Sequence, residues 1–536
     1  MTSPDLQPPG TPRRPGAREL IERTLDPGSW QSWDEPAIGI GPIDPVYAAD
    51  LRAAREHTGL DESLITGEGK LGGRTVALIV GDFGFLAGSI GVAAAERFVL
   101  AAERARRLRL PLIASPSSGG TRMQEGTVAF LQMVKISAAV AAHRAAGLPY
   151  LVYLRHPTTG GVLASWGMLG HLSAAEPGAL LGFLGPRVYE ALHGEPFPVG
   201  VQTAENLFRH GLIDAVVEPE DLRRIAVDAL DILTRGEIPP PDQIRDDTRL
   251  ATPRPIRPDE RATVHERATA DEATTDPDEL PDIPAWESIT RSRRPERPGV
   301  RGLLRVAART VVPLNGTGQG EHDPGILLAL ARFGEAGCIV LGQDRRGAQI
   351  PMGPAGLREA RRGMRLAAEL GLPLVSVIDT AGAALSQAAE EGGLAAEIAR
   401  SLADLITLPA PTVCLLLGQG AGGIALALLP ADRVIAAQHA WLSPLPPEGA
   451  SVIVHRTTER APELAADQRV RSADLLRDGI VDRVVRERPD AADEPETFLH
   501  RVGSVLEQEL LAVLNLDPEH RLESRLSRYR TLGLPT

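Results

Sequence analysis

The chain has 536 residues, enough for several domains, and its hydrophobic content of 43% is that of a globular protein. Its formal net charge of −13 argues against a general nucleic-acid binder, although it leaves room for a local basic pocket. The two cysteines, Cys338 and Cys414, lie in separate apolar runs, so neither a disulfide framework nor a zinc ribbon is indicated.

Two segments of the chain bear on its location. Residues 1–17 are rich in proline and polar residues, so we expect them to be disordered and to contain no signal peptide. The longest weakly polar window, Thr412–Ala431, is interrupted by glycines, which favours a strand, a turn and a helix in a globular core. We therefore expect a cytoplasmic protein with no membrane span.

Residues 18–236 alternate predicted helices and strands. Helices are predicted at Ala17–Leu25, Pro45–Thr58, Ala93–Arg107, Glu125–Ala146, Val162–Leu172 and Leu222–Arg235, strands at Thr75–Val80, Pro111–Ala114, Leu148–Leu154 and Ile213–Val217, and a turn at Gly67–Gly73. Such alternation predicts an α/β domain with a mostly parallel sheet and helices on its faces.

A glycine pair, Gly160-Gly161, stands where the predicted strand 148–154 gives way to a helix. At such a point main-chain N–H groups are unpaired, the helix dipole favours negative charge, and the missing Cβ permits close approach. These are the requirements of an oxyanion hole made of main chain. A lone pair of this kind is more often a plain turn, so a second observation is needed.

A second copy of the pattern supplies that observation. The strand-like run 411–417 leads into Gly418-Gln419-Gly420-Ala421-Gly422-Gly423 and a predicted helix at Ile424–Leu429. Gly160-Gly161 and Gly422-Gly423 are separated by the same offset as Leu110-Pro111 and Leu372-Pro373, and a short insertion lengthens the offset near the end of the second copy. The chain is therefore interpreted as a tandem duplication of one domain.

Residues 237–300 interrupt the pattern with many prolines and charged residues, and they are predicted to be a linker with one docked helix within Pro281–Arg291. Its arginine cluster is interpreted as a solvated face, with an anion-binding edge as the alternative; the members are Arg291, Arg293, Arg294, Arg297, Arg301 and Arg305. The second domain is predicted at 301–490 and a helical tail at 491–536.

The first copy resembles the beta subunit of bacterial acetyl-CoA carboxylase carboxyltransferase over about residues 67–235. The matching stretches include Ser118–Gly126, Pro157–Ser165 and Gly182–Val188. The second copy resembles the alpha subunit over about 310–490, through Glu390-Glu391-Gly392 and Gly418–Leu428 among others. The order is similar to that of fused carboxyltransferases of acyl-CoA carboxylases. The resemblance implies two tandem crotonase-like (ClpP-type) ββα spiral domains.

The resemblance also implies a reaction: transfer of a carboxyl group from carboxybiotin to the α-carbon of acetyl-CoA or a related acyl-CoA. Two oxyanions arise, so two main-chain holes are expected and no side-chain base is required. By analogy, Gly160 and Gly161 hold the thioester oxygen, while Gly423 and Ile424, preceded by Gly422, hold the biotin oxygen. Gly119, Gly120 and Arg122 shape the acyl-CoA pocket, and for Arg122 a structural salt bridge is an equal alternative.

Two departures from the family pattern stand out. The four-cysteine zinc ribbon of the beta subunit is missing, so no metal is expected. Around the second glycine loop, Gln419 replaces an acidic residue and Ile424 replaces a glycine. A β-branched residue does not tolerate a positive φ, so the biotin half of the site is the less secure prediction.

No Met-Lys-Met biotinylation motif occurs in the sequence. The resemblance therefore implies a separate biotin carboxyl carrier protein and a separate biotin carboxylase as partners. It further implies a homodimer or a higher homo-oligomer with active sites between chains. Two alternatives stay open: a decarboxylase of malonyl-type thioesters, which needs only the enolate hole, and a non-catalytic scaffold.

Overall fold

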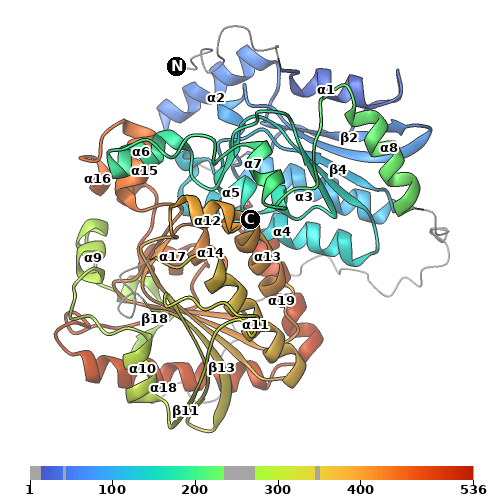
Figure 1. The fold of residues 1–536 in the computed structure, drawn as a ribbon. Coiled ribbons are helices and arrows are strands. Elements are labelled where there is room, and N and C mark those ends of the chain that lie inside the picture. The colour runs from blue at the N-terminus through green and yellow to red at the C-terminus, as the bar shows by residue number, and fades with distance from the viewer. Residues whose placement is uncertain (1–13, 40–43, 235–271, 345–350, 535–536) are drawn as a thin grey trace.

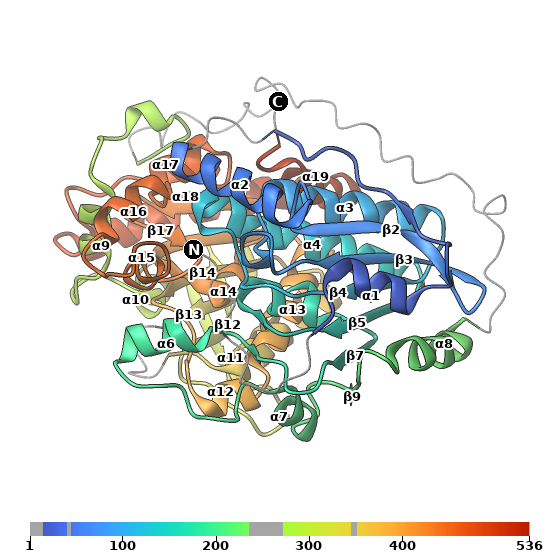
Figure 2. The same cartoon turned by 90° about the horizontal axis from the view of Figure 1, so that it is seen from above.

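The computed structural model describes residues 14–39, 44–234, 272–344 and 351–534. Two domains follow one another along the chain, and each is built around one twisted sheet with helices packed against it (Figure 1). The predicted disorder of residues 1–17 and most of the predicted linker fall outside the described residues. Figure 2 shows the two sheets from above, with the first domain in blue to green.

The described part of the first domain has a sheet in the order β1-β2-β3-β4-β5-β7-β9. Neighbours are antiparallel from β1 to β3 and parallel from there on. The strands are β1 (Gln31–Ser32), β2 (Leu64–Leu71), β3 (Arg74–Gly81), β4 (Leu112–Ser115), β5 (Tyr150–Leu154), β7 (Leu172–Ala175) and β9 (Ala215–Val216), and β6 (Thr158–Thr159) pairs with β8 (Leu181–Gly182) beside the sheet.

Helices cover this sheet on both faces. They are α1 (Ala17–Thr24), α2 (Pro45–Thr58), α3 (Val92–Arg107), α4 (Gly126–Ala145), α5 (Gly160–Leu163), α6 (Pro186–His193), α7 (Ala204–Arg209) and α8 (Leu222–Leu233). Helix α2 shows why these bounds arise. Asp44 accepts hydrogen bonds from the first turn, proline occupies the first position, and Gly59 in the left-handed region ends the helix.

The second domain repeats this arrangement. Its sheet runs β10-β18-β16-β15-β14-β13-β12-β11 within the described residues, with β17 paired to β15. The strands are β10 (Ala273–Thr274), β11 (Thr310–Leu314), β12 (Ile326–Phe333), β13 (Ala336–Gln343), β14 (Leu374–Thr380), β15 (Thr412–Ala421), β16 (Arg433–Ala437), β17 (Trp441–Ser443) and β18 (Arg483–Val485). The helices are α9 (Ala285–Ser292), α10 (Val300–Ala307), α11 (Pro354–Leu370), α12 (Gln387–Glu391), α13 (Leu394–Ile406), α14 (Gly422–Leu426), α15 (Pro447–His455), α16 (Ala461–Asp467), α17 (Ser472–Arg477), α18 (Pro495–Leu514) and α19 (Pro518–Thr531).

The constant offset between the two copies extends to the elements. The first residues of β2, β3, β4, β5 and α3 are separated by that same offset from the first residues of β12, β13, β14, β15 and α11. Strands β9 and β18 are separated by the slightly longer offset that the sequence indicates near the end of the second copy. The predicted α/β fold of two tandem ββα domains is therefore confirmed.

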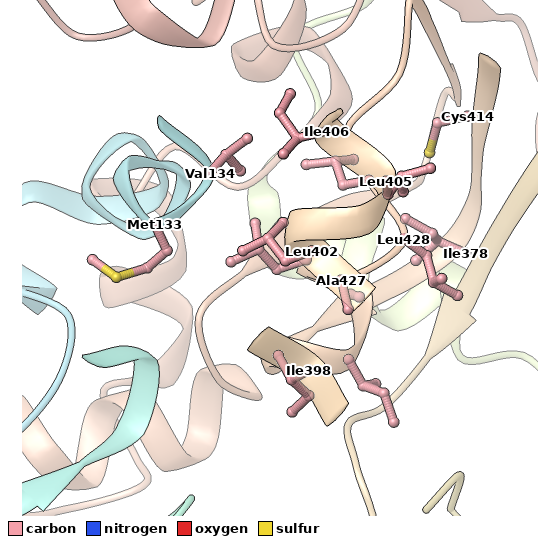
Figure 3. Close-up of a cluster of buried hydrophobic side chains, with 14 of the residues drawn as sticks. Met133, Val134, Ile378, Ile398, Leu402, Leu405, Ile406, Cys414, Ala427 and Leu428 are labelled. Carbon is pink, nitrogen blue, oxygen red and sulfur yellow. The ribbon is translucent and has the colours of Figure 1, made fainter. Parts of the chain in front are cut away.

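The two domains pack through equivalent helices. Val134 of α4 points toward α13, which contributes Leu402, Leu405 and Ile406 to a shared apolar core (Figure 3). Helices α6 and α15, which also correspond in the duplication, contact each other. By length and composition, Met123–Ala145 is apolar enough to cross a bilayer, but most of it is buried against neighbouring helices.

Several predicted boundaries differ from the structure. The predicted turn 67–73 is mostly strand β2, and only its last two residues turn. The predicted helix 162–172 is shorter, because α5 ends at Leu163 and strand β7 begins at Leu172. Within the predicted linker, α9 confirms the docked helix, whereas β10 joins the sheet of the second domain by pairing with β18.

The arginine cluster divides into paired and exposed members. Arg293 pairs with Glu448, Arg294 with Asp490, and Arg297 with the fully buried Glu487, and these carboxylates belong to the second domain. Neither predicted alternative describes these three arginines, whereas Arg301 and Arg305 are exposed, as a solvated face requires. Cys338 and Cys414 are both buried, as their apolar runs suggest, and burial raises the pKa of each thiol to about 12.

The predicted tail, 491–536, consists of two helices that pack on the body. Helix α18 crosses the sheet of the second domain. Helix α19 is fixed to that domain by the buried Arg525, which pairs with Asp432, and to the first domain by Arg530, which pairs with Glu96 and Glu103. The tail therefore spans both domains.

Candidate functional site

The first candidate site lies where the Ser117–Thr121 turn meets the start of α5. A Cβ placed on Gly120 would lie 3.3 Å from the Cα of Gly160 and 3.3 Å from the nitrogen of Gly161. A Cβ on Gly160 would lie 3.3 Å from the carbonyl oxygen of Gly119. The main chains of Gly119 and Gly120 therefore lie directly against those of Gly160 and Gly161. A side chain at Gly120 or Gly160 would keep these two segments apart.

Within this cluster the two glycines of α5 have different tasks. Gly160 has a φ of +63°, which favours glycine, and its N–H donates to the carbonyl oxygen of Phe183 at 3.1 Å. Gly161 follows as the second residue of the helix, where N–H groups lack an intrahelical acceptor. Gly160 therefore makes the turn, and the N–H of Gly161 stands as a donor in the first turn of the helix.

The surroundings of Gly161 are compact but reachable from solvent. A Cβ on Gly161 would lie 2.9 Å from Oγ1 of Thr121 and 3.5 Å from Cγ of Met133. Gly119 is exposed, and Gly160 and Gly161 are half-buried. A thioester oxygen can thus approach the main chain here, with the Thr121 hydroxyl at its side.

The second domain repeats the backbone of the first site in two places: the loop after β14, which contains Gly382, and the start of α14. Gly382 has a φ of +129° and donates its N–H to Oγ1 of Thr380 at 3.1 Å. At the matching position, Gly120 has a φ of +109° and donates to Oγ of Ser118 at 3.0 Å. Gly422, with a φ of +73°, opens α14 as Gly160 opens α5.

Accessibility distinguishes the second site from the first. Gly422, Gly423 and Ile424 are all buried. A Cβ on Gly423 would lie 3.0 Å from Cε2 of Phe183 and 3.3 Å from Cδ1 of Ile398. Ile424 is helical and is not among the residues with positive φ, so the predicted conflict with its branched side chain does not arise. At the matching position of α5 stands another β-branched residue, Val162.

One residue, Phe183, touches both sites. Its carbonyl oxygen accepts the N–H of Gly160, and its ring lies against Gly423. Its own N–H donates to Oε1 of Glu390 at 2.8 Å, and the side chain of Gln202 donates to the same oxygen at 2.8 Å. Glu390 belongs to α12 of the second domain, so this bridge joins the two domains within one chain.

Glu390 is an unusual bridge because it is buried and its recorded partners are neutral. Burial raises the pKa of Glu390 above its usual value, and the hydrogen bonds from Gln202, Phe183 and Leu184 oppose that rise. The carboxylate therefore holds the residues after β8 against α12.

Arg122 is placed away from solvent. Its side chain is fully buried and pairs with Glu62 through two hydrogen bonds of 2.5 and 2.8 Å, and it donates to the carbonyl oxygen of Ser89 at 2.6 Å. Burial opposes its charge, but Glu62 raises the pKa of Arg122. The geometry favours the structural alternative: Arg122 supports the turn that carries Gly119 and Gly120 from beneath.

Sequence reasoning assigned no role to Thr121, Phe183 or Glu390. All three lie inside stretches that match the family pattern, so the signal was present, but side-chain type alone does not indicate a task. An open cavity of about 500 Å³ lies elsewhere, near α10 and β12, and contains none of the predicted site residues. Among the described residues, no group of three His, Cys, Asp or Glu side chains could hold a metal ion.

Comparisons with known proteins agree on one family. The family model described as acetyl co-enzyme A carboxylase carboxyltransferase-like matches residues 261–533. The chain is 58% identical over 519 residues to a probable biotin-dependent acyl-coenzyme A carboxylase beta3 subunit of Mycobacterium tuberculosis, covering 96% of this chain and 98% of the relative. It is 36% identical over 537 residues to the acetyl-coenzyme A carboxylase carboxyl transferase subunits beta/alpha of Salinispora tropica, covering 98% and 92%.

Solved structures also resemble the chain. The crystal structure of transcarboxylase 12S with methylmalonyl-coenzyme A bound has 19% identity and a TM-score of 0.34, covering 92% of this chain and 89% of that one. The beta subunit of geranyl-CoA carboxylase from P. aeruginosa has 16% identity and a TM-score of 0.34, covering 93% and 87%.

Proposed function

The chain belongs to the family of carboxyltransferase subunits of biotin-dependent acyl-CoA carboxylases, and from this premise we propose that it carboxylates the α-carbon of acetyl-CoA or a related acyl-CoA. Acetyl-CoA is the first candidate because the motifs match those of acetyl-type subunits, and malonyl-CoA is then the product. Such a product would serve fatty acid or polyketide synthesis.

The first half of the proposed site would bind the thioester. The N–H of Gly161 can donate to the thioester oxygen, and Gly119 and Gly120 keep the wall beside it free of side chains. Loss of the α-proton places negative charge on this oxygen. Main-chain donors fixed at a helix start stabilise that charge without reorganisation, which lowers the barrier to enolate formation.

The second half would hold the ureido oxygen of biotin. When bound, carboxybiotin supplies the carboxyl group and a basic nitrogen for the α-proton. The residues fit a ureido oxygen in their chemistry, since Gly422 turns the chain and the N–H of Gly423 stands in the first turn of α14. The ring of Phe183 lies against Gly423 and bounds the proposed biotin site on one side.

The observation that carries the proposal is the meeting of both glycine pairs at Phe183 in one chain. Carboxyl transfer needs two oxyanion sites close together, whereas a scaffold needs neither. The proposed partners are a separate biotin carboxyl carrier protein and a separate biotin carboxylase. A homodimer or a higher homo-oligomer in a cytoplasmic setting remains part of the proposal, and mass photometry of the purified chain tests it.

The test of the function uses malonyl-CoA and the purified chain, with and without free biotin, and mass spectrometry of the CoA products. Biotin-dependent formation of acetyl-CoA supports carboxyl transfer run in reverse, in which the carboxyl group passes to the biotin nitrogen and the α-carbon takes up a proton; the carboxybiotin so formed releases CO2 afterwards. Gly161→Val should abolish it, because the added atoms meet Thr121 and Met133. Gly337→Val is the matched control, since no atom lies within 4 Å of a Cβ at that position.

The buried state of the second glycine pair favours one competing function, decarboxylation of a malonyl-type thioester at the first site alone. Turnover that is equal with and without biotin would establish that alternative. No turnover in either case, with Gly161→Val leaving CoA binding unchanged, would indicate the scaffold.

A further inference from the structure

The ring of Phe183 covers the second glycine pair from the side of the first domain. Gly423 is buried, and the atoms closest to a Cβ built there are Cε2 and Cζ of Phe183, at 3.0 and 3.2 Å, followed by Cδ1 of Ile398 at 3.3 Å. Amide groups at the start of α14 have no intrahelical acceptor, so in this state burial alone separates them from water.

The two covering side chains both belong to the core between the domains, but they differ in the element that carries them. Ile398 lies in the body of helix α13. Phe183 lies in the connection between β8, which ends at Gly182, and α6, which begins at Pro186. Phe183 is therefore the covering side chain that does not belong to a helix.

We propose that Phe183 controls access to the second glycine pair: its ring shields Gly423 and must swing away before a planar cyclic urea such as the ureido ring of biotin reaches that main chain. The inference rests on the proposed function and adds a specificity element to it. The ring contributes from the acyl-CoA domain, so it can close the biotin half of the site whenever that half is empty.

Glu390 acts as the positioning residue for this cover. It fixes the Phe183 main chain through the 2.8 Å hydrogen bond from its N–H, while Gly160 fixes the carbonyl end at 3.1 Å. With the main chain held at both ends, a movement of the cover has to be made by the side chain. The same bridge ties the cover to the first glycine pair.

The first experiment measures the reverse reaction with malonyl-CoA and free biotin for the wild type, Phe183→Leu and Phe183→Ala. An open state populated one time in ten raises the apparent KM for biotin about tenfold. We expect Phe183→Ala to lower that KM up to about tenfold, Phe183→Leu to be intermediate, and the KM for malonyl-CoA to stay unchanged. Phe208→Ala, which changes an exposed phenylalanine on α7, is the matched control. A KM for biotin that is unchanged or raised in Phe183→Ala overturns the proposal.

The second experiment needs no turnover and therefore separates this inference from the proposed function. Hydrogen exchange is followed by mass spectrometry on peptides that contain Gly422–Leu426 and Gly160–Leu163. Phe183→Ala should speed exchange at α14 at least about tenfold, because a buried amide without an acceptor is protected only by its cover. Exchange at α5 and at the amide of Thr127, which donates to the carbonyl oxygen of Gln468 at 3.3 Å, should not change. Equal exchange at α14 in wild type and variant contradicts the cover even if carboxyl transfer is confirmed.

Variants of Glu390 test its positioning role through the KM for biotin, which should change while the KM for malonyl-CoA does not. Glu390→Gln keeps an acceptor for the Phe183 N–H and should behave as the wild type in the KM for biotin. Glu390→Ala removes the acceptor and should lower that KM while the KM for malonyl-CoA holds. If Glu390→Ala and Glu390→Gln change both KM values alike, the positioning role is wrong.

Discussion

At the scale of single residues, the two glycines of each pair are required for different physical reasons. Gly160 adopts a φ of +63° and extends the β6–β8 pairing through its hydrogen bond to Phe183. Gly161 is not among the residues with positive φ, but a Cβ there would come within 2.9 Å of Oγ1 of Thr121. Gly160 is thus required because its backbone conformation favours glycine, and Gly161 is required because there is no room for a Cβ.

Gly161→Ala tests this division. We expect a fall in kcat/KM of about 10²-fold, the order observed when an oxyanion donor is lost, because the methyl group occupies the approach to the N–H. Thr121→Ala removes the atom that the methyl group meets, so the double variant should keep its fold but regain little activity. Full recovery in the double variant would show that the clash, and not the blocked approach, caused the loss.

Arg122 and Glu62 form the second test at this scale, since both side chains are buried and paired. Burial alone would raise the pKa of Glu62, but the Arg122 guanidinium holds it below its usual value. Arg122→Met should lower the free energy of unfolding by about 3–5 kcal/mol, because an unpaired carboxylate stays buried. Arg122→Met with Glu62→Leu should recover most of that loss, as measured by denaturant unfolding.

The lowered pKa of Glu62 also fixes the direction of a pH effect. An acid with a depressed folded pKa stabilises the fold fully above its unfolded pKa, near about 4.3, and loses this contribution as pH falls through the folded value. In Arg122→Met, burial raises the pKa of Glu62, so the variant's buried carboxylate takes up a proton at a higher pH than that of the wild type. The stability advantage of the wild type over Arg122→Met should therefore be largest while both carboxyls are ionised, shrink as pH falls through the raised pKa of the variant, and shrink further below about pH 4. A constant advantage down to pH 2 would contradict the ion pair as its source.

The residue scale also shows where sequence reasoning stops. The glycine positions could be predicted because strand, glycine pair and helix follow one another locally and recur in the second copy. The burial of Arg122 depends on Glu62, which is distant in the sequence, and the contact between Phe183 and Gly423 depends on how two domains meet. The sequence suggested that the branched side chain of Ile424 would conflict with a positive φ. The structure gives Ile424 a helical conformation, which could not be known from the sequence.

At the scale of elements, the two domains resemble each other more closely in their helices and strands than in their amino-acid sequences. Strands β2 and β3 have the same lengths and spacing as β12 and β13, although the two hairpins share little sequence. A hairpin needs only alternating buried and exposed positions and a turn, and many residue types satisfy these needs. The geometry of the hairpin is therefore kept after most of its amino acids have been replaced. The short strand β10 could not be predicted, because its two residues pair with β18, which lies near the other end of the second domain.

Helix α19 gives the prediction at this scale. Arg530 donates to both oxygens of Glu96 and to Glu103, and Lys135 also pairs with Glu96, so the helix joins a charged network of the first domain. Arg530→Ala should lower the free energy of unfolding of the first domain by about 1–3 kcal/mol, as for lost hydrogen bonds to charged groups. The exposed pair Arg477–Asp278 is the control, and Arg477→Ala should cost under about 1 kcal/mol. Equal effects of the two variants in calorimetry would contradict the bridging role of α19.

At the scale of the whole molecule, the chain resembles a dimer of two related domains. Helices α4 and α13 correspond in the duplication and contact each other across the boundary (Figure 3), and the same holds for helices α6 and α15 (Figure 1). The domain boundary also carries Glu390 against Phe183 and Thr127 against the carbonyl oxygens of Leu442 and Gln468. Phe183 of the first domain thus lies against Gly423 of the second, while Glu390 of the second domain holds the main chain of Phe183.

This architecture predicts that the covalent connection is dispensable. Residues 14–234 and 272–534, produced as two chains in one cell, should co-purify in a 1:1 ratio and retain biotin-dependent turnover of malonyl-CoA. The reason is that the contacts between the domains are made by α4, α13, α6, α15 and α19, all inside the two pieces. Leu402→Asp in the second piece puts a charge into the shared apolar core, at a cost of several kcal/mol, and should abolish co-purification. Two well-folded pieces that stay apart, or a complex that Leu402→Asp leaves intact, would contradict the packing of α4 on α13 as the basis of assembly.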